Sequence, residues 1–207
     1  MDIIRQNIEH INRKKDEITI RTGREPGEVL LVAVTKTRTA EEINAAIDAG
    51  ITDIGENKVQ EIISKYEKVK PVRWHMIGHL QTNKVKYIID KVYLIHSVDS
   101  MKLALEIDKR AAQFGIFMDI LIQVNAAKED SKFGINSEET GDFIKDILEN
   151  CKNIRIRGLM CIAPFKDDPE DVRVYFREVK ELYVRYSGIN HPRLDFKYLS
   201  MGMSHDY

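Results

Sequence analysis

A regular repeat of short apolar strings most strongly constrains the fold of this chain. Seven strings rich in β-branched residues occur along it, and the first four begin about 21 residues apart. They span residues 29–35, 51–54, 72–77, 92–95, 117–124, 154–160 and 196–199. Such runs are typical of strands buried on both faces of a parallel sheet, and the spacing leaves room for one crossover helix between strands. The pattern therefore predicts a parallel α/β fold.

Helix signals fill the intervals between the strings. Thr39 and Glu42 have the spacing of a capping box, and Gly50 follows the predicted helix end. Asn136 and Glu139 repeat that spacing. We therefore predict helices after residues 39 and 136.

Two further helices are indicated by apolar stripes. Asp168-Pro169 is expected to cap and start a helix whose stripe consists of Val172, Phe176, Val179, Tyr183 and Tyr186. Near the N-terminus, a helical stripe consists of Ile4, Ile8, Ile11 and Ile18. We expect this first helix to pack on the body of the domain.

Two parallel architectures compete, an open doubly wound sheet and a (β/α)8 barrel. The first string leads into Thr35-Lys36-Thr37-Arg38 rather than a Gly-rich dinucleotide fingerprint, and the near-even unit length suits a barrel. A barrel needs an eighth strand, but the chain stops at Tyr207, directly after the seventh string and its loop. We expect a single barrel domain over 1–207, with the C-terminal helix and strand 8 missing from this chain.

Composition excludes several classes of protein. Lys and Arg (32) nearly balance Asp and Glu (33), which argues against a nucleic-acid or anionic-membrane binder. The N-terminus lacks the apolar stretch of a signal peptide, and two cysteines are too few for a disulfide framework. We expect a cytoplasmic protein, and a monomer because no extra apolar helix stripe is evident.

Lys36 stands at the C-terminal end of the first predicted strand, where barrels carry their chemistry. A partly desolvated lysine there has a lowered pKa and provides the neutral amine for Schiff-base chemistry. Alternatively, Lys36 begins a solvent-facing loop, and the pattern alone does not decide between the two.

Other strand ends offer companions for Lys36. Small residues over 200–204 follow the seventh string, where barrels commonly hold a phosphate, although a plain turn would look the same. Glu56 suits an acid or base, but pairing with a neighbouring Lys or Arg is commoner. His75 and His79 are four residues apart, yet no nearby carboxylate or cysteine completes a ligand set, so no metal site is expected. Asp206 suits a helix N-cap.

Several strings, in order, resemble one known family. They are residues 32–37 (VAVTKT), 55–57 (GEN), 74–84 (WHMIGHLQTNK), 97–100 (SVDS), 123–125 (QVN), 157–160 (RGLM) and 199–204 (LSMGMS). By these motifs, which cover nearly the whole chain, it resembles the YggS/PROSC family of pyridoxal phosphate homeostasis proteins. That family is similar in fold to the N-terminal domain of alanine racemase.

The resemblance implies a pyridoxal phosphate held as an internal aldimine on Lys36. It also implies a phosphate cradle and a pocket lining, the cradle formed by Ser200, Gly202 and Ser204, and the lining by Asn57, His79, Ser97 and Met160. Lys132 aligns with a loop lysine that helps in cofactor exchange, or is a solvated loop charge.

Two departures from the family pattern stand out. Lys58 replaces a usual aromatic residue near the pocket rim. The family's final segment, with an Arg-Ile-Gly string and an arginine facing the pyridine nitrogen, is absent before Tyr207. A protein that ended there would bind the cofactor more weakly.

The leading functional hypothesis is a non-catalytic carrier that buffers or delivers pyridoxal phosphate to apo-enzymes. It would thereby influence vitamin B6 and amino-acid pools. The alternative is a pyridoxal-phosphate-dependent racemase or lyase that uses the same Lys36. A third class is a cofactor-free barrel aldolase, with Lys36 bonding its substrate directly.

Overall fold

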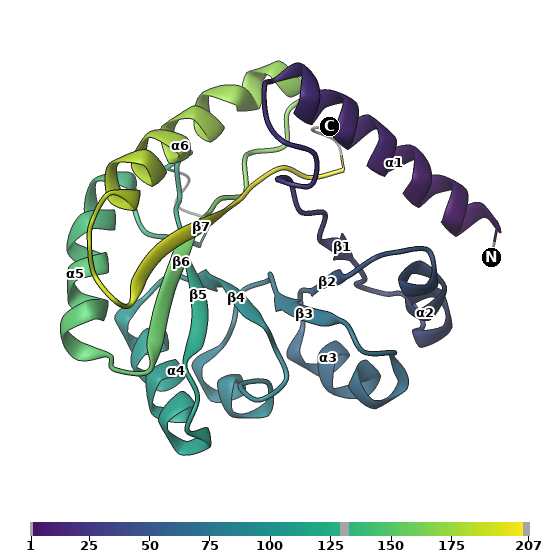
Figure 1. Ribbon diagram of the computed structural model, residues 1–207. Coiled ribbons are helices and arrows are strands. Elements are labelled where there is room, and N and C mark those ends of the chain that lie inside the picture. Colours follow the sequence, from purple (N-terminus) through teal and green to yellow (C-terminus); the bar gives the residue numbers. More distant parts are fainter. Residues whose placement is uncertain (1, 129–132, 205–207) are drawn as a thin grey trace. The chain divides into compact units, whose positions relative to one another are not determined.

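The computed structural model describes residues 2–128 and 133–204. The chain divides into two compact units, Met1–His75 and Met76–Tyr207. Strands alternate with helices along both (Figure 1). The strands are β1 (Ala33–Val34), β2 (Asp53–Glu56), β3 (Arg73–Met76), β4 (Leu94–Val98), β5 (Met118–Gln123), β6 (Ile154–Met160) and β7 (Leu194–Ser200). The α-helices are α1 (Asp2–Arg21), α2 (Ala40–Asp48), α3 (Val59–Lys65), α4 (Met101–Phe114), α5 (Thr140–Asn150) and α6 (Arg173–Ser187).

Strand pairing within each unit is parallel and follows chain order. In the first unit β1 pairs with β2, and in the second β4 pairs with β5, β5 with β6 and β6 with β7. All seven predicted strings contain a strand or overlap one. Over residues 2–128 and 133–204 there are these seven strands and no eighth.

The first predicted strand, residues 29–35, is wrong in extent. Only Ala33 and Val34 form a ladder, and Val34 is 52% exposed. The register pairs Ala33 with Ile54, so residues before Ala33 face the chain ahead of β2. That chain is the turn after α2, which contains Gly50 at φ +101°, and it offers no strand to pair with.

The core of the second unit lies between its strands and helices α4, α5 and α6, which flank the strands on one side (Figure 1). Every residue of β4 and β5 is buried, as predicted for strands covered on both faces. The helices contribute buried residues Leu103, Ile107, Phe143, Ile147, Val179 and Leu182. Burial of a large aliphatic or aromatic side chain stabilises the fold by about 1.5–3 kcal/mol.

Helix α1 packs on α2 in the first unit, as expected for the N-terminal stripe. Ile8 is buried and Ile4 and Ile11 are half-buried, but Ile18 is 36% exposed. Thr19 is buried in its place. Three helical turns from Ile8 reach residue 19 rather than 18, so the predicted stripe was wrong by one position at its end.

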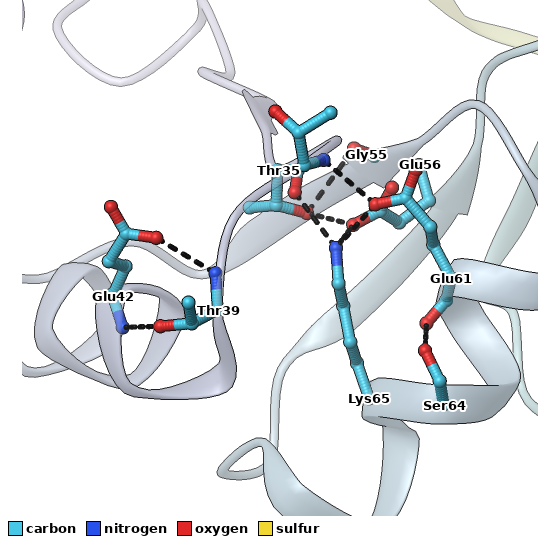
Figure 2. Close-up of polar contacts among 9 residues, drawn as sticks. Thr35, Thr39, Glu42, Gly55, Glu56, Glu61, Ser64 and Lys65 are labelled. Atoms are coloured by element: carbon cyan, nitrogen blue, oxygen red, sulfur yellow. Dashed lines mark hydrogen bonds and ion pairs between the residues drawn. The ribbon is translucent and has the colours of Figure 1, made fainter.

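The predicted capping box at the start of α2 is confirmed (Figure 2). The backbone N–H of Glu42 donates to Thr39 Oγ1 at 3.3 Å, and the N–H of Thr39 donates to Glu42 Oε2 at 2.8 Å. Two N–H groups that lack helical partners are thereby satisfied.

Replacing Thr39 with alanine is expected to lower the free energy of unfolding by about 1 kcal/mol, because one helix-terminal N–H loses its acceptor. Urea denaturation of the variant against wild type measures the change. Thr39→Ser keeps the hydroxyl and should stay close to wild type. Equal stability of the alanine and serine variants would contradict the prediction.

The other two predicted helix starts differ in detail. Asn136 Nδ2 donates to Glu139 Oε2 at 3.0 Å, so the Asn136 side chain caps no backbone N–H, and a 3-10 turn (Ser137–Glu139) precedes α5. Asp168 Oδ1 accepts from the N–H of Glu170 at 2.9 Å, confirming the cap. A 3-10 turn (Pro169–Val172) then delays the start of α6. The described helices include none with the length and apolar character needed to cross a bilayer.

Candidate cofactor site

Lys36 lies in the turn directly after β1. The N–H of Arg38 donates to the carbonyl of Thr35 at 3.1 Å, which makes residues 35–38 a tight turn with Lys36 in second position. The Lys36 side chain is exposed, not partly desolvated as expected from its strand-end position. Its amine is therefore accessible to a ligand.

Thr37, the third residue of this turn, has φ +64°. Turns with positive φ at that position usually carry glycine, because the left-handed region crowds a branched side chain. The backbone beside Lys36 is therefore held in a conformation that costs about 1–3 kcal/mol on its own.

Asn57 follows β2 at the same sheet edge as Lys36. The register pairs Val34 with Gly55, so Lys36 and Asn57 each come two residues after paired positions of parallel strands. Asn57 is half-buried. The structure thus places these two predicted site residues at corresponding positions of the first unit.

Glu56, next to Asn57, is fully buried and paired with Lys65. Lys65 Nζ lies 2.8 Å from Glu56 Oε1, which also accepts from Thr35 Oγ1 at 2.8 Å (Figure 2). This confirms the commoner interpretation of Glu56, pairing with a nearby lysine. Glu56 Oε2 is buried with no hydrogen-bond partner among the residues that the structure describes.

In the second unit, Ser200 at the end of β7 reaches across to β4. Its hydroxyl lies 2.9 Å from His96 Nδ1. The neighbouring Ser97 is fully buried, and within residues 2–128 and 133–204 its Oγ has no hydrogen-bond partner. A buried hydroxyl without a partner is costly unless a ligand or water satisfies it.

Met160 ends β6 directly beside Ser200, its register partner on β7. The side chain is buried in a cluster with Leu94 and Leu121, against which Tyr198 packs. The predicted pocket-lining methionine is therefore also part of the hydrophobic core.

Gly202 and Ser204 lie in the exposed loop after β7. Gly202 has φ +92°, in the left-handed region that favours glycine, and a Cβ there would meet no atom within 4 Å. Among the described residues there is therefore open space beside the backbone at Gly202.

His79, in the segment after β3, is stacked on Phe133, with ring centroids 3.7 Å apart and planes 12° from parallel. Its Nδ1 lies 3.3 Å from Asp99 Oδ2, just beyond the end of β4. The ring is thus oriented by an aromatic face and a carboxylate, and its exposed side chain is available to a ligand.

His75 and His79 have different partners. His75 is buried in β3, with Nε2 2.8 Å from Asp53 Oδ1. Burial lowers the pKa of His75 below its ordinary value despite the opposing carboxylate, so the ring is neutral at pH 7. In the part of the chain that the structure describes, no three His, Cys, Asp or Glu side chains group as metal ligands.

Two predicted residues lie outside the described ranges, namely Lys132 and Asp206. Three residues near the candidate site were not predicted from the sequence: His96, Lys65 and Phe133. Glu61 and Lys65 have the i,i+4 spacing of an ordinary surface ion pair, so the sequence pattern does not reveal that Lys65 is buried against Glu56. His96 sits in a strand buried at every position, so no alternation reveals where its side chain points.

A hollow of about 330 Å³ in the second unit lies away from the predicted site residues. Its lining includes Met118 and Arg155, at the beginnings of β5 and β6. Met160 and Ser200 stand at the opposite ends of β6 and β7.

Comparison with known proteins defines the class of the fold. The family model of the alanine racemase N-terminal domain matches residues 5–207. An alanine racemase from Clostridium difficile has the same fold at a TM-score of 0.71 and 12% identity, over 94% of this chain and 51% of that one. The predicted fold class, the α/β barrel type of the alanine racemase N-terminal domain, is confirmed, with seven strands described.

Closer relatives narrow the class to one family. A pyridoxal phosphate homeostasis protein from Aquifex aeolicus is 43% identical over 189 residues, which cover 90% of this chain and 82% of the relative. The corresponding Escherichia coli protein is 35% identical over an alignment of 215 positions, which covers 100% of this chain and 88% of the relative. This chain belongs to the family of pyridoxal phosphate homeostasis proteins, as the sequence motifs indicated.

Two solved structures are also similar. An unknown protein from Bifidobacterium adolescentis superposes with a TM-score of 0.91 at 32% identity, over 98% of this chain and 87% of that one. PipY from Synechococcus elongatus, solved with pyridoxal phosphate bound, has a TM-score of 0.77 at 31% identity, over 93% and 89%.

Proposed function

We propose that this protein binds pyridoxal 5'-phosphate through Lys36 and buffers or delivers it in vitamin B6 and amino-acid homeostasis. The observation that carries the proposal is the similarity to PipY, which was solved with the cofactor bound. The names of the Aquifex aeolicus and Escherichia coli relatives support the homeostatic role.

The described residues fit the chemistry of this cofactor. When bound, pyridoxal phosphate supplies an aldehyde that condenses with a neutral amine, forming a C=N bond and releasing one water. Lys36 provides an exposed primary amine on a held turn. Ser97 Oγ is a buried hydroxyl still lacking a partner among the described side chains.

We assign three roles to the remaining predicted residues. Ser200, Gly202 and Ser204 hold the phosphate with hydroxyls and backbone N–H groups, which suit an anion. His79 and Asn57 orient the ring of the cofactor from exposed or half-buried positions. Met160 supplies an apolar wall from the core cluster.

We propose a carrier rather than an enzyme. Relatives at 35–43% identity bear the homeostasis name, whereas the racemase match at 12% identity is evidence of fold alone. We further propose that residues 1–207 act as one cofactor-binding domain and that the protein is a cytoplasmic monomer delivering cofactor to apo-enzymes. The family match over 5–207 supports the single domain, and the two cysteines, Cys151 and Cys161, are buried thiols, which suit a reducing compartment.

The experiment is cofactor loading followed by chemical trapping. Purified protein titrated with pyridoxal phosphate is expected to develop a visible absorption band with one cofactor per chain. Borohydride reduction should then fix the pyridoxyl group on the peptide that contains Lys36, as read by mass spectrometry. Absence of the band, or a label on another lysine only, would overturn the assignment.

A turnover assay separates the carrier from the enzyme. The loaded protein is expected to leave D- and L-alanine unchanged over hours. Sustained racemisation or loss of an amino acid would establish the racemase or lyase alternative. Trapping of a substrate carbon skeleton on Lys36 without pyridoxal phosphate would instead indicate an aldolase.

A further inference from the structure

The backbone on both sides of Lys36 is hydrogen-bonded to two charged side chains of α3, Lys65 and Glu61. Figure 2 shows Lys65 directed toward Thr35, the residue before Lys36. Before Lys36, the Thr35 carbonyl accepts from Lys65 Nζ at 3.0 Å. After it, the N–H of Thr37 donates to Glu61 Oε2 at 2.8 Å. The Lys36 side chain itself is left exposed.

Lys65 uses all three ammonium protons in this arrangement. Besides the Thr35 carbonyl, it donates to Glu56 Oε1 at 2.8 Å and to Glu61 Oε2 at 2.7 Å. An ammonium has three donors, so none remains for a ligand. Lys65 is 9% exposed and Glu56 fully buried, so the Lys65–Glu56 pair is sheltered from solvent, whereas Glu61 is half-buried.

Glu61 connects the hydrogen bonds made before Lys36 with the one made after it. Its Oε2 accepts from both Lys65 Nζ and the N–H of Thr37. That second contact falls on the residue whose φ is +64°, where a threonine needs support from its surroundings. Loss of Glu61 would therefore release the strained half of the turn while leaving the Lys65–Glu56 pair in place.

The charges of Lys65 and Glu61 are stable at neutral pH. Burial opposes the charged form of Lys65, but hydrogen bonds to Glu56 and Glu61 outweigh it and raise the Lys65 pKa above its ordinary value. The hydrogen bond from Lys65, opposed by burial and aided by the Thr37 N–H, lowers the pKa of Glu61. Both side chains stay ionised around pH 7.

We propose that Glu61 and Lys65 are positioning residues that fix the turn carrying Lys36 and so direct its amine toward the cofactor aldehyde. They act through Thr35 and Thr37 and touch no ligand themselves. This inference rests on the proposed function of Lys36, and it assigns a role to two residues that lie behind the turn carrying Lys36.

The test compares Glu61→Ala with the control Glu67→Ala, an exposed glutamate in the 3-10 turn Tyr66–Lys68. The first readout needs no cofactor: amide hydrogen exchange at residue 37, followed by NMR. We expect about tenfold faster exchange in Glu61→Ala, because one hydrogen bond to a charged acceptor is lost, and no change in Glu67→Ala.

The second readout is the rate constant for uptake of pyridoxal phosphate, followed by its visible band. It is expected to fall about tenfold in Glu61→Ala and to remain at the wild-type value in Glu67→Ala. Glu61→Gln retains an acceptor oxygen for the Thr37 N–H and should recover part of the rate. A purely structural role predicts lower stability with an unchanged uptake rate per folded molecule.

The outcomes distinguish a failure of the proposed function from a failure of the positioning role. Wild-type protein that takes up no cofactor at Lys36 defeats the proposed function, whatever the variants do. Normal uptake by wild type together with unchanged exchange and uptake in Glu61→Ala overturns the positioning role alone. Should Glu61→Ala fail to fold, the same two readouts are measured on Glu61→Gln. Lys65→Met provides a further variant. If its uptake rate equals that of wild type and its amide exchange at residue 37 is unchanged, the positioning role is likewise overturned.

Discussion

A protein in which alanine replaces Lys36 is expected to fold normally and to show no visible absorption band with pyridoxal phosphate. The Lys36 side chain is exposed, so its truncation removes little packing. The apparent dissociation constant should rise by about a hundredfold, because the covalent bond is lost while the phosphate contacts remain. Absorbance titration measures the band, and equilibrium dialysis measures the residual binding.

The matched control is Lys68→Ala. Lys68 is an exposed lysine of the same unit, at the end of the 3-10 turn Tyr66–Lys68. It should keep the band and an affinity within about twofold of wild type, since an exposed charge contributes little. If the Lys36→Ala protein still forms the band, the covalent bond must be assigned to another lysine.

Replacing Gly158 with alanine is expected to lower the free energy of unfolding by about 3 kcal/mol or more. Gly158 has φ +142°, and a Cβ there would overlap the carbonyl oxygen of Tyr198, its register partner on β7. The obstacle is backbone, so β6 and β7 must separate to admit the methyl group. Urea denaturation of the variant measures the effect.

Gly188→Ala provides the control for this substitution. Gly188 follows α6 with φ −83°, and a Cβ there meets no atom within 4 Å. Its effect should stay below about 1 kcal/mol in either direction. Comparable losses in the two variants would show that the close approach of β6 and β7 is not what requires glycine at position 158.

The strand framework was predictable because its evidence is local. Continuous apolar strings marked β3, β5 and β6 nearly residue by residue, and the Thr39–Glu42 spacing marked the start of α2. The string 92–95 marked only the first two residues of β4, because the strand continues into the polar His96 and Ser97. The extent of β1 was not predictable in this way, because Val29 to Val32 have the apolar character of a strand but no partner in register. Whether a segment forms a strand depends on a second segment that it can pair with, and the hydrophobic periodicity of the first segment carries no information about that partner.

The position of a candidate residue was predictable where it depends on the chain alone, as for Lys36, which lies in the turn directly after β1. Roles that depend on side-chain direction were not. The Glu61–Lys65 spacing is the same whether the pair faces water or, as here, turns toward the buried Glu56. Likewise, whether Asn136 caps a helix or donates to Glu139 depends on the orientation of one amide.

The hydrogen bond between His96 and Ser200 bears on the order in which the second unit assembles. Its strand pairs all join neighbours in the chain, but this contact joins residues 104 apart. Contacts between distant segments form late, since a long loop must close first, and β4 to β6 emerge from the ribosome before β7. We therefore expect a ligand that contacts Ser200 to bind only chains in which β7 has docked, and to leave folding intermediates without a docked β7 unbound.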